Sequence, residues 1–158
     1  MILDETLEFA DAESVAAAAG TALIGDVIPL GDVQRDIGNG EPLYLVITTA
    51  TEIITGGTAG TINFALASDA AAAIATDGSA TVHFQTKDFV TDDANTNDAE
   101  LNAGGVIAAV ALPMEGVPYE SYLGILCTIG TTTVTAGAIN AFLTHDVAKW
   151  KAYDGVTG

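Results

Sequence analysis

The clearest pattern in the chain is TINFALA, residues Thr61–Ala67. Its large apolar side chains, Ile62, Phe64 and Leu66, occupy every second position. Successive side chains of a β-strand point to opposite faces of the sheet. This spacing therefore predicts a strand with one buried face.

The same alternation recurs in Thr81–Lys87, where Val82 and Phe84 are the apolar members. Two other stretches, Leu43–Ile47 and Leu123–Ile129, are apolar on both faces. Such strands lie in the interior of a sheet or place one face against another subunit. Clusters of Gly, Pro, Asn, Asp and Ser mark turns and divide the chain into eight expected strands. These are approximately Glu5–Phe9, Leu23–Leu30, Leu43–Ile53, Thr61–Ala67, Thr81–Lys87, Val106–Pro113, Tyr122–Ile129 and Gly137–His145.

Eight short strands in a chain of 158 residues predict an all-β fold. The strand number suits a two-sheet sandwich, a jelly roll of about eight antiparallel strands. We expect a single domain over residues 1–158, with N-terminal and C-terminal segments free to extend to partners. The pattern leaves the strand order open.

Several shorter stretches connect the expected strands. Ser14 ahead of the alanine-rich Val15–Ala19, and the run Ala70–Ile74, are candidates for single helical turns. The glycine-rich stretch Gly56–Gly60 is expected to form a hairpin tip, and Thr91–Asp98 a polar loop.

The charge balance limits the partners of this protein. The chain has 21 Asp and Glu against 4 Lys and Arg, a formal net charge of −17. That charge would repel nucleic-acid phosphates and anionic lipid head groups, so we expect neither nucleic acid nor membrane as a partner. No apolar run approaches the roughly 18 residues of a spanning helix, and Met1–Glu5 lacks the basic start of a secretory signal. We expect a soluble product made in the cytoplasm.

The surface is expected to be poor in charge, because only 16% of the residues are charged. A dispersed globular protein usually carries about 25% charged residues of both signs. This composition is expected if a partner covers part of the surface. The alternative is that the high net charge alone keeps a monomer dispersed.

Signals of catalysis are weak in this sequence. None of the four serines lies in a Gly-x-Ser-x-Gly motif, and His83 and His145 lack the spacing of a zinc site. The single cysteine, Cys127, lies in an apolar run, which favours a buried, unreactive thiol. We therefore expect no enzyme activity, no cofactor and no metal.

One loop partly resembles a calcium site. Asp93, Asn95 and Asn97 match the first three ligand positions of a calcium-binding loop. The sixth position is Asp98 where a glycine is needed, and the twelfth is Gly104 where a bidentate Glu is needed. The sequence favours a solvated acidic loop and leaves open whether Asp92–Asn97 binds a cation.

Two terminal segments are candidates for partner contacts. Near the C-terminus, an aromatic and cationic cluster suits an interface anchor, although it could equally fold back over its own sheet. Its members are Lys149, Trp150, Lys151 and Tyr153. Near the N-terminus, a run of acidic residues could meet a basic partner or simply be solvated. Its members are Asp4, Glu5, Glu8, Asp11 and Glu13.

Three stretches of the chain carry a resemblance to a known family. They are the opening residues Met1–Asp4 and Phe9–Ala12, the run RDIGNGEPLYL at Arg35–Leu45, and the late pattern of Tyr122–Gly124 and Gly137–Ile139. Together they resemble the capsid cement proteins of podovirus-type tailed phages, a family that includes the jelly-roll cement protein of a Bordetella phage.

The resemblance implies a small jelly roll that sits on the outer surface of an icosahedral capsid in the virion. Such a decoration protein clamps neighbouring major capsid proteins, associates with itself, as a homodimer in preference to a homotrimer, and needs no cofactor. A second hypothesis is a carbohydrate- or receptor-binding β-sandwich module of a phage tail, in which aromatic residues stack on sugars. A cupin-type enzyme ranks third, because it would need a His-rich metal triad.

Overall fold

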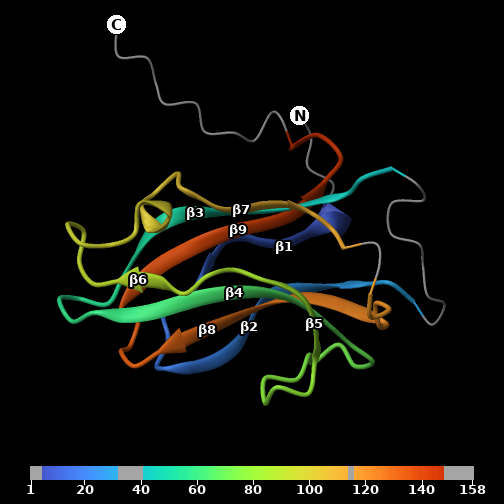
Figure 1. Ribbon diagram of the computed structural model, residues 1–158, viewed down its shortest axis with the longest axis horizontal. Helices are drawn as coiled ribbons and strands as arrows, with labels where there is room; N and C mark the ends of the chain where they lie inside the picture. The colour runs from blue at the N-terminus through green and yellow to red at the C-terminus, as the bar shows by residue number, and fades with distance from the viewer. Residues whose placement is uncertain (1–4, 32–40, 114–115, 148–158) are drawn as a thin grey trace, which may run out of the picture.

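The computed structural model of the chain describes residues 5–31, 41–113 and 116–147. These residues form nine strands and two short 3₁₀ helices, arranged as two sheets face to face (Figure 1). The helices are η1 (Glu5–Leu7) and η2 (Ala99–Leu101). The strands are β1 (Glu8–Ser14), β2 (Gly20–Pro29), β3 (Tyr44–Ile54), β4 (Gly60–Asp69), β5 (Thr81–Gln85), β6 (Phe89–Thr91), β7 (Val106–Ala111), β8 (Tyr122–Gly130) and β9 (Ala136–Thr144). No helix among them is long and apolar enough to span a membrane.

The strand order is that of a jelly roll. One sheet has the order β1-β9-β3-β7, and the other has the order β2-β8-β4-β5, with β6 also paired to β4. Every pairing is antiparallel, and the pairs are nested along the chain: β4 with β5 and β6, β3 with β7, β2 with β8, and β1 with β9. Strands β5 and β6 together take the place of one strand of the eight-stranded pattern. The predicted all-β, two-sheet sandwich is confirmed.

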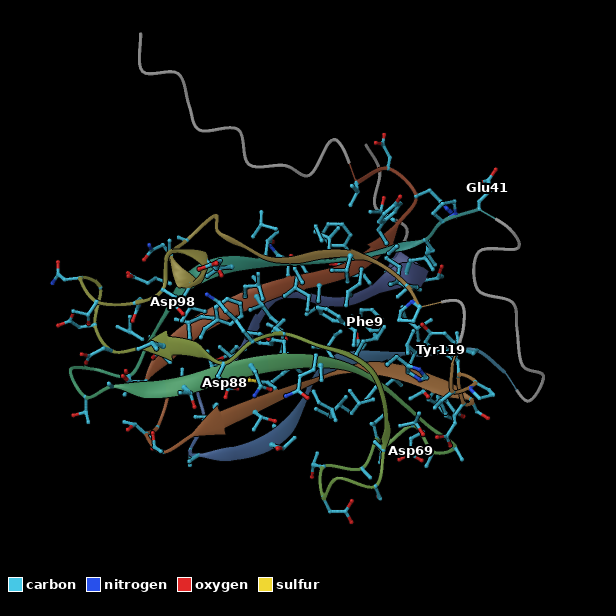
Figure 2. All side chains as sticks on the ribbon, in the orientation of Figure 1. Phe9, Glu41, Asp69, Asp88, Asp98 and Tyr119 are labelled. Carbon is cyan, nitrogen blue, oxygen red and sulfur yellow. The ribbon has the colours of Figure 1, made fainter. Side chains whose placement is uncertain are left out.

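The inward faces of the two sheets form the main core. On β4 the predicted inward positions are confirmed, because Ile62, Phe64 and Leu66 are fully buried between the sheets. The expectation of only one buried face is wrong, because Asn63, Ala65 and Ala67 of the outer face are buried as well. Phe9 of β1 lies between the sheets as well (Figure 2). Both strands predicted to be apolar on both faces, β3 and β8, are interior strands of their sheets.

The outer face of β8 is covered by the chain itself. Ile74, in the connection between β4 and β5, packs with Ala65, Ala67 and Leu126 in a second, smaller apolar cluster on the outer side of the five-stranded sheet. Ile74 also lies directly above Gly124, where no side chain would fit without displacing it. This internal cover accounts for the apolar outer face of β8 without a second subunit.

Several local expectations are wrong. The expected strand Glu5–Phe9 begins as a 3₁₀ helix, and the strand itself runs from Glu8 to Ser14. Strand β6 was not expected. Gly56–Gly60 is no hairpin tip, because β3 and β4, which it joins, belong to different sheets. The loop expected at Thr91–Asp98 begins one residue later, since Thr91 ends β6.

Neither candidate helical turn forms. After β1, the amide of Val15 donates to the carbonyl of Gly137, and the carbonyl of Ala17 accepts from Val134. After β4, the carboxylate of Asp69 accepts hydrogen bonds from the amides of Ala71 and Ala75. In both segments these bonds to other partners replace the helical ones, which outweighs the helix propensity of alanine.

A bulge in β5 reverses the predicted orientation of Val82. Leu66 pairs with Phe84, but Ala67 pairs with Val82, so His83 is the extra residue between them. Phe84 packs against the core as expected. Val82 is turned to the outer face and is 48% exposed. A bulge changes the alternation of every residue beyond it, which the local pattern alone does not show.

The two sheets come together most closely where β2 passes β1. Gly25 has φ +64°, a left-handed conformation, and a Cβ at this position would overlap the carbonyl oxygen of Phe9. Only glycine combines this conformation with so close a backbone contact.

We predict that Gly25→Ala destabilises the fold more than a matched glycine substitution does. Gly78→Ala is the control, because Gly78 also has positive φ (+92°), but a Cβ added there would meet no atom within 4 Å. The control should cost about 1–2 kcal/mol of unfolding free energy for the left-handed backbone. Gly25→Ala should cost ~1–3 kcal/mol more, as overpacked sites do. Urea unfolding of the two variants measures the difference, and equal losses would contradict the close contact.

We also predict that the Cys127 thiol is unreactive in the native protein. The side chain is 1% exposed, and burial raises its pKa to about 12. Because the thiolate is the reactive form, labelling by iodoacetamide at pH 8 should be limited by the rate of unfolding and should become fast in urea. Native labelling at the rate of a free thiol would show that β8 is not held as described.

Candidate interaction surface

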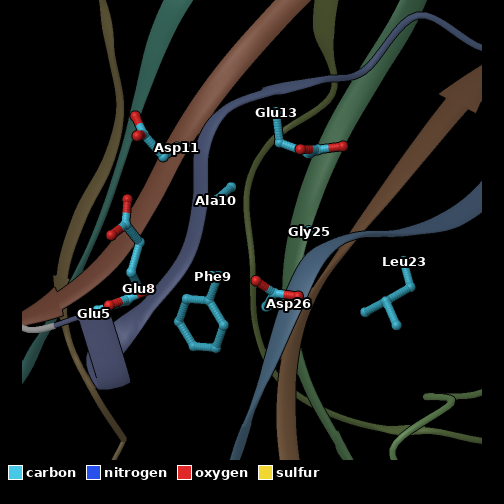
Figure 3. Close-up of a pocket in the computed structure, with 9 residues that line it drawn as sticks. All are labelled: Glu5, Glu8, Phe9, Ala10, Asp11, Glu13, Leu23, Gly25 and Asp26. Atoms are coloured by element: carbon cyan, nitrogen blue, oxygen red, sulfur yellow. The ribbon is translucent and has the colours of Figure 1, made fainter.

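The most distinctive surface feature is an acidic pocket on the side of the sandwich where β1 and β2 run past one another (Figure 3). It is an open cavity of about 790 Å³, and its lining residues also include Phe9, Ala10, Leu23 and Gly25. The Phe9 side chain is buried in the core, so the accessible lining is mainly polar. Carboxylates surround it. They belong to Glu5, Glu8, Asp11, Glu13 and Asp26.

Irregularities in β1 turn its acidic residues toward this side. The pairing of β1 with β9 shifts register on either side of Ala10, and Ala12 has φ +49°. The amide of Ala12 donates to the Asn140 side chain at 2.7 Å, which holds the irregular strand against β9. Bulges of this kind strengthen the local twist of an edge strand and redirect its side chains.

The second wall comes from β2. Its pairing with β8 shifts register between Ile24 and Ile28, and the intervening stretch contains Gly25 and Asp26. The contact of Gly25 with Phe9 brings this irregular stretch beside β1, and Asp26 thereby joins the acidic residues of β1. The sequence pattern contained no signal for Asp26, because its neighbours in the pocket come from another strand.

The acidic run predicted near the N-terminus is therefore gathered into one surface. Glu5, Glu8, Asp11 and Glu13 all line the pocket, while Asp4 lies outside the described residues. None of the pocket carboxylates forms an ion pair within the described part of the chain. Like charges around a concave surface concentrate a negative potential there, which suits a cationic partner.

On the opposite side of the sandwich, the outer edge of β6 is closed by the side chain and backbone of Asp98. The amide of Val90 on β6 donates to the Asp98 carboxylate at 2.9 Å, and the Asp98 amide donates to the Val90 carbonyl at 3.0 Å. Lys87 lies 3.5 Å from Asp98 and 3.6 Å from Glu100, with its ammonium 4.8 Å from the centre of the Phe89 ring. A strand edge whose backbone groups are occupied in this way does not accept another strand.

The loop that partly matched a calcium site uses its oxygens internally. Asp93 Oδ1 accepts the Asn95 amide at 2.8 Å, and Asn97 Oδ1 accepts the Asp92 amide at 2.7 Å. The Asn97 side chain also donates to the carbonyl of Ile53. Asp92 Oδ1 and Thr91 Oγ1 are buried without a partner, but the described His, Cys, Asp and Glu residues include no group of three that could hold a metal. These side chains stabilise the turn through hydrogen bonds to the backbone.

The two histidines lie in different surroundings. His83 Nε2 is 2.7 Å from Ser68 Oγ, and its ring stacks on Tyr119. His145 follows β9, and its Nδ1 is 3.2 Å from the carbonyl oxygen of Pro42.

The other predicted contact residues, Lys149, Trp150, Lys151 and Tyr153, lie outside the described residues. So do Met1–Asp4 and the larger part of the Arg35–Leu45 run. Most of the described parts of the resemblance fall on strands, and Glu41–Leu43 lie just before β3. Phe9–Ala12, Leu45 and Gly137–Ile139 lie on β1, β3 and β9, which are neighbours in one sheet, and Tyr122–Gly124 lies on β8 of the other.

Comparison with known proteins identifies a family. The model of the Bbp16 family matches residues 9–143, which extend from β1 into β9 and so include nearly all of the sandwich. No curated protein matches the chain. The chain belongs to the Bbp16 family, which links it to the proteins of bacteriophages.

Proposed function

We propose that this protein is a capsid cement protein, which binds the outside of a phage icosahedral shell and clamps neighbouring major capsid proteins. The observation that carries the proposal is the extent of the family match, residues 9–143, over the described jelly roll. The same sandwich contains the described stretches that resemble phage cement proteins. The proposed function therefore belongs to the sandwich itself.

The proposed mechanism is mechanical and requires no reaction or cofactor. Packed DNA pushes a shell outward, and a protein that contacts two neighbouring capsid subunits adds buried area across the seam between them. Each contact contributes little, but an assembly held at several points gains from effective concentration. Binding to the assembled shell alone stabilises that shell by linkage.

The acidic pocket is the described surface that best suits the capsid contact. Its carboxylates have no ion-pair partner among the described residues, and the β6 edge across the molecule is closed by Asp98. Two copies of a chain with a net charge of −17 repel one another wherever acidic surfaces meet. A basic surface of the capsid protein is the complementary partner.

Self-association is part of the proposal through the resemblance, with a homodimer favoured over a homotrimer. The sequence argument from strands apolar on both faces does not support it for β8, because Ile74 covers the outer face of that strand. Large apolar side chains exposed on the described surface are confined to Val82, Val90 and Val117.

We predict that shells without this protein melt at a lower temperature than complete shells and release DNA earlier. Adding back the purified chain should restore the higher temperature in proportion to occupancy. Calorimetry of stripped, complete and reconstituted particles makes the comparison. Identical melting of stripped and complete shells would refute the cement function.

We predict that Glu8→Gln with Asp11→Asn weakens binding to shells and reduces its salt dependence. Removing two pocket charges should cost about 1 kcal/mol, or roughly fivefold in Kd. The matched control is Glu41→Gln with Glu52→Gln, which changes the net charge equally but lies outside the pocket. Figure 2 shows Glu41 at the end of the sandwich. Equal loss of binding in both variants would mean that overall charge acts and the pocket does not.

A further inference from the structure

One cluster of side chains fastens the described part of the connection between β7 and β8 to the edge of the five-stranded sheet. Contacts outside this cluster also hold it: the Ser121 carbonyl accepts the amide of Leu30, and Tyr119 packs against the main core and donates its hydroxyl to the carbonyl of Pro113. The amide of Glu120 donates to Ser68 Oγ at 3.1 Å, and Ser68 Oγ is 2.7 Å from His83 Nε2. The rings of His83 and Tyr119 stack with their centroids 4.0 Å apart. The hydroxyl of Thr81 donates to the Glu120 carboxylate at 2.7 Å. Residues 116–121, here called the strap, are thus tied to β4 and β5.

The hydrogen bonds of Ser68 assign the protonation state of His83. Ser68 is fully buried, and its oxygen already accepts the amide of Glu120. Its hydroxyl proton needs an acceptor, and among the described residues His83 Nε2 is the one within reach. His83 must then be neutral, with its ring proton on Nδ1.

Protonation of Nε2 would remove that acceptor. The imidazolium would donate to Ser68 Oγ, which would then face two N–H donors while its own proton had no partner. A buried hydroxyl without an acceptor is costly, and the bond most easily given up is the one from the strap, because Glu120 can reach solvent by moving away. Loss of that bond also loosens the stack of Tyr119 on His83.

The surroundings of His83 oppose the charged form. Partial burial lowers the pKa of His83, an effect that the Glu120 carboxylate partly offsets. Tyr119 is neutral, since burial raises its pKa to about 12. From β4, Ser68 carries no charge, and the carboxylate of Asp69 is bonded to backbone amides of the loop that follows it.

We propose that His83, Ser68 and Tyr119 form an acid-released latch, which holds the strap closed while His83 is neutral and loosens it at Glu120 when His83 takes up a proton. The strap carries Val117, which is 64% exposed, so release alters an apolar part of the surface at this end of the sandwich. The latch does not depend on the proposed cement function.

The direction of the pH effect follows from linkage. The closed state favours neutral His83, so the latch is at full strength above the ordinary histidine pKa of 6.5 and is lost as the pH falls through the lower pKa of the closed state. The equilibrium constant for opening of the strap can change at most tenfold for each pKa unit between the ordinary value and the value in the closed state.

The test is the amide of Glu120, whose hydrogen bond to Ser68 reports directly on the latch. NMR of the full chain between pH 7.5 and 5 gives the pKa of His83 from its ring signals and the hydrogen-exchange protection of Glu120. Protection should fall with the titration of His83, by the factor that its measured pKa dictates. The amide of Thr135, which lies between β8 and β9 and donates to the carbonyl of Ile54, should keep its protection.

Three variants separate the latch from general acid loosening. His83→Gln keeps an acceptor for Ser68 without a titrating group, so Glu120 should stay protected throughout. His145→Gln, the matched control, should leave the transition unchanged. Glu120→Gln should move it to lower pH, because the carboxylate favours the imidazolium. The latch is refuted if Glu120 protection is independent of His83 titration, if His83→Gln retains the transition, or if Thr135 loses protection in parallel.

Discussion

The ladder between β4 and β8 is the constraint on which the rest of the structure depends. It runs from Thr61 opposite Gly130 to Asp69 opposite Tyr122, and its inner face pairs Ile62 with Ile129, Phe64 with Cys127 and Leu66 with Ile125. Each of these side chains stabilises the fold by roughly 1.5–3 kcal/mol when buried, so the face must be covered. The sheet of β1, β9, β3 and β7 supplies the cover, and a sandwich results.

Where the ladders are irregular, the molecule acquires its distinctive surfaces. Register shifts in β1 and β2 assemble the acidic pocket, and the bulge at His83 in β5 turns that imidazole toward Ser68 while exposing Val82. Regular pairing would have left both sets of groups on separate faces. In this protein the bulges decide which polar side chains meet, as they often do near functional sites.

Charge is distributed unevenly over the described surface. Its one basic side chain, Lys87, is engaged by Asp98 and Glu100 beside the closed β6 edge. The acidic groups of the pocket have no such partner there. The β6 edge is closed, and the opposite side of the sandwich is strongly acidic. Both features discourage strand pairing between copies, and the acidic side suits a cationic partner.

The sequence by itself determined the all-β class, seven of the strands to within a few residues, the apolar character of both faces of β3 and β8, the buried Cys127 and the acidic run near the N-terminus. These follow from side-chain alternation and turn residues, which act over a few neighbouring positions.

The contact role predicted for Lys149, Trp150, Lys151 and Tyr153 lies outside the described residues and stays a prediction. The tertiary structure decided that β3 and β8 are interior strands of their sheets. Only the tertiary structure decided that Asp26 joins the pocket, that Val82 faces outward, that Gly56–Gly60 crosses between sheets and that Ala70–Ile74 is not helical. Each of these depends on which distant strand lies alongside and in what register, and that is set by burial across the whole sandwich and not by the local pattern.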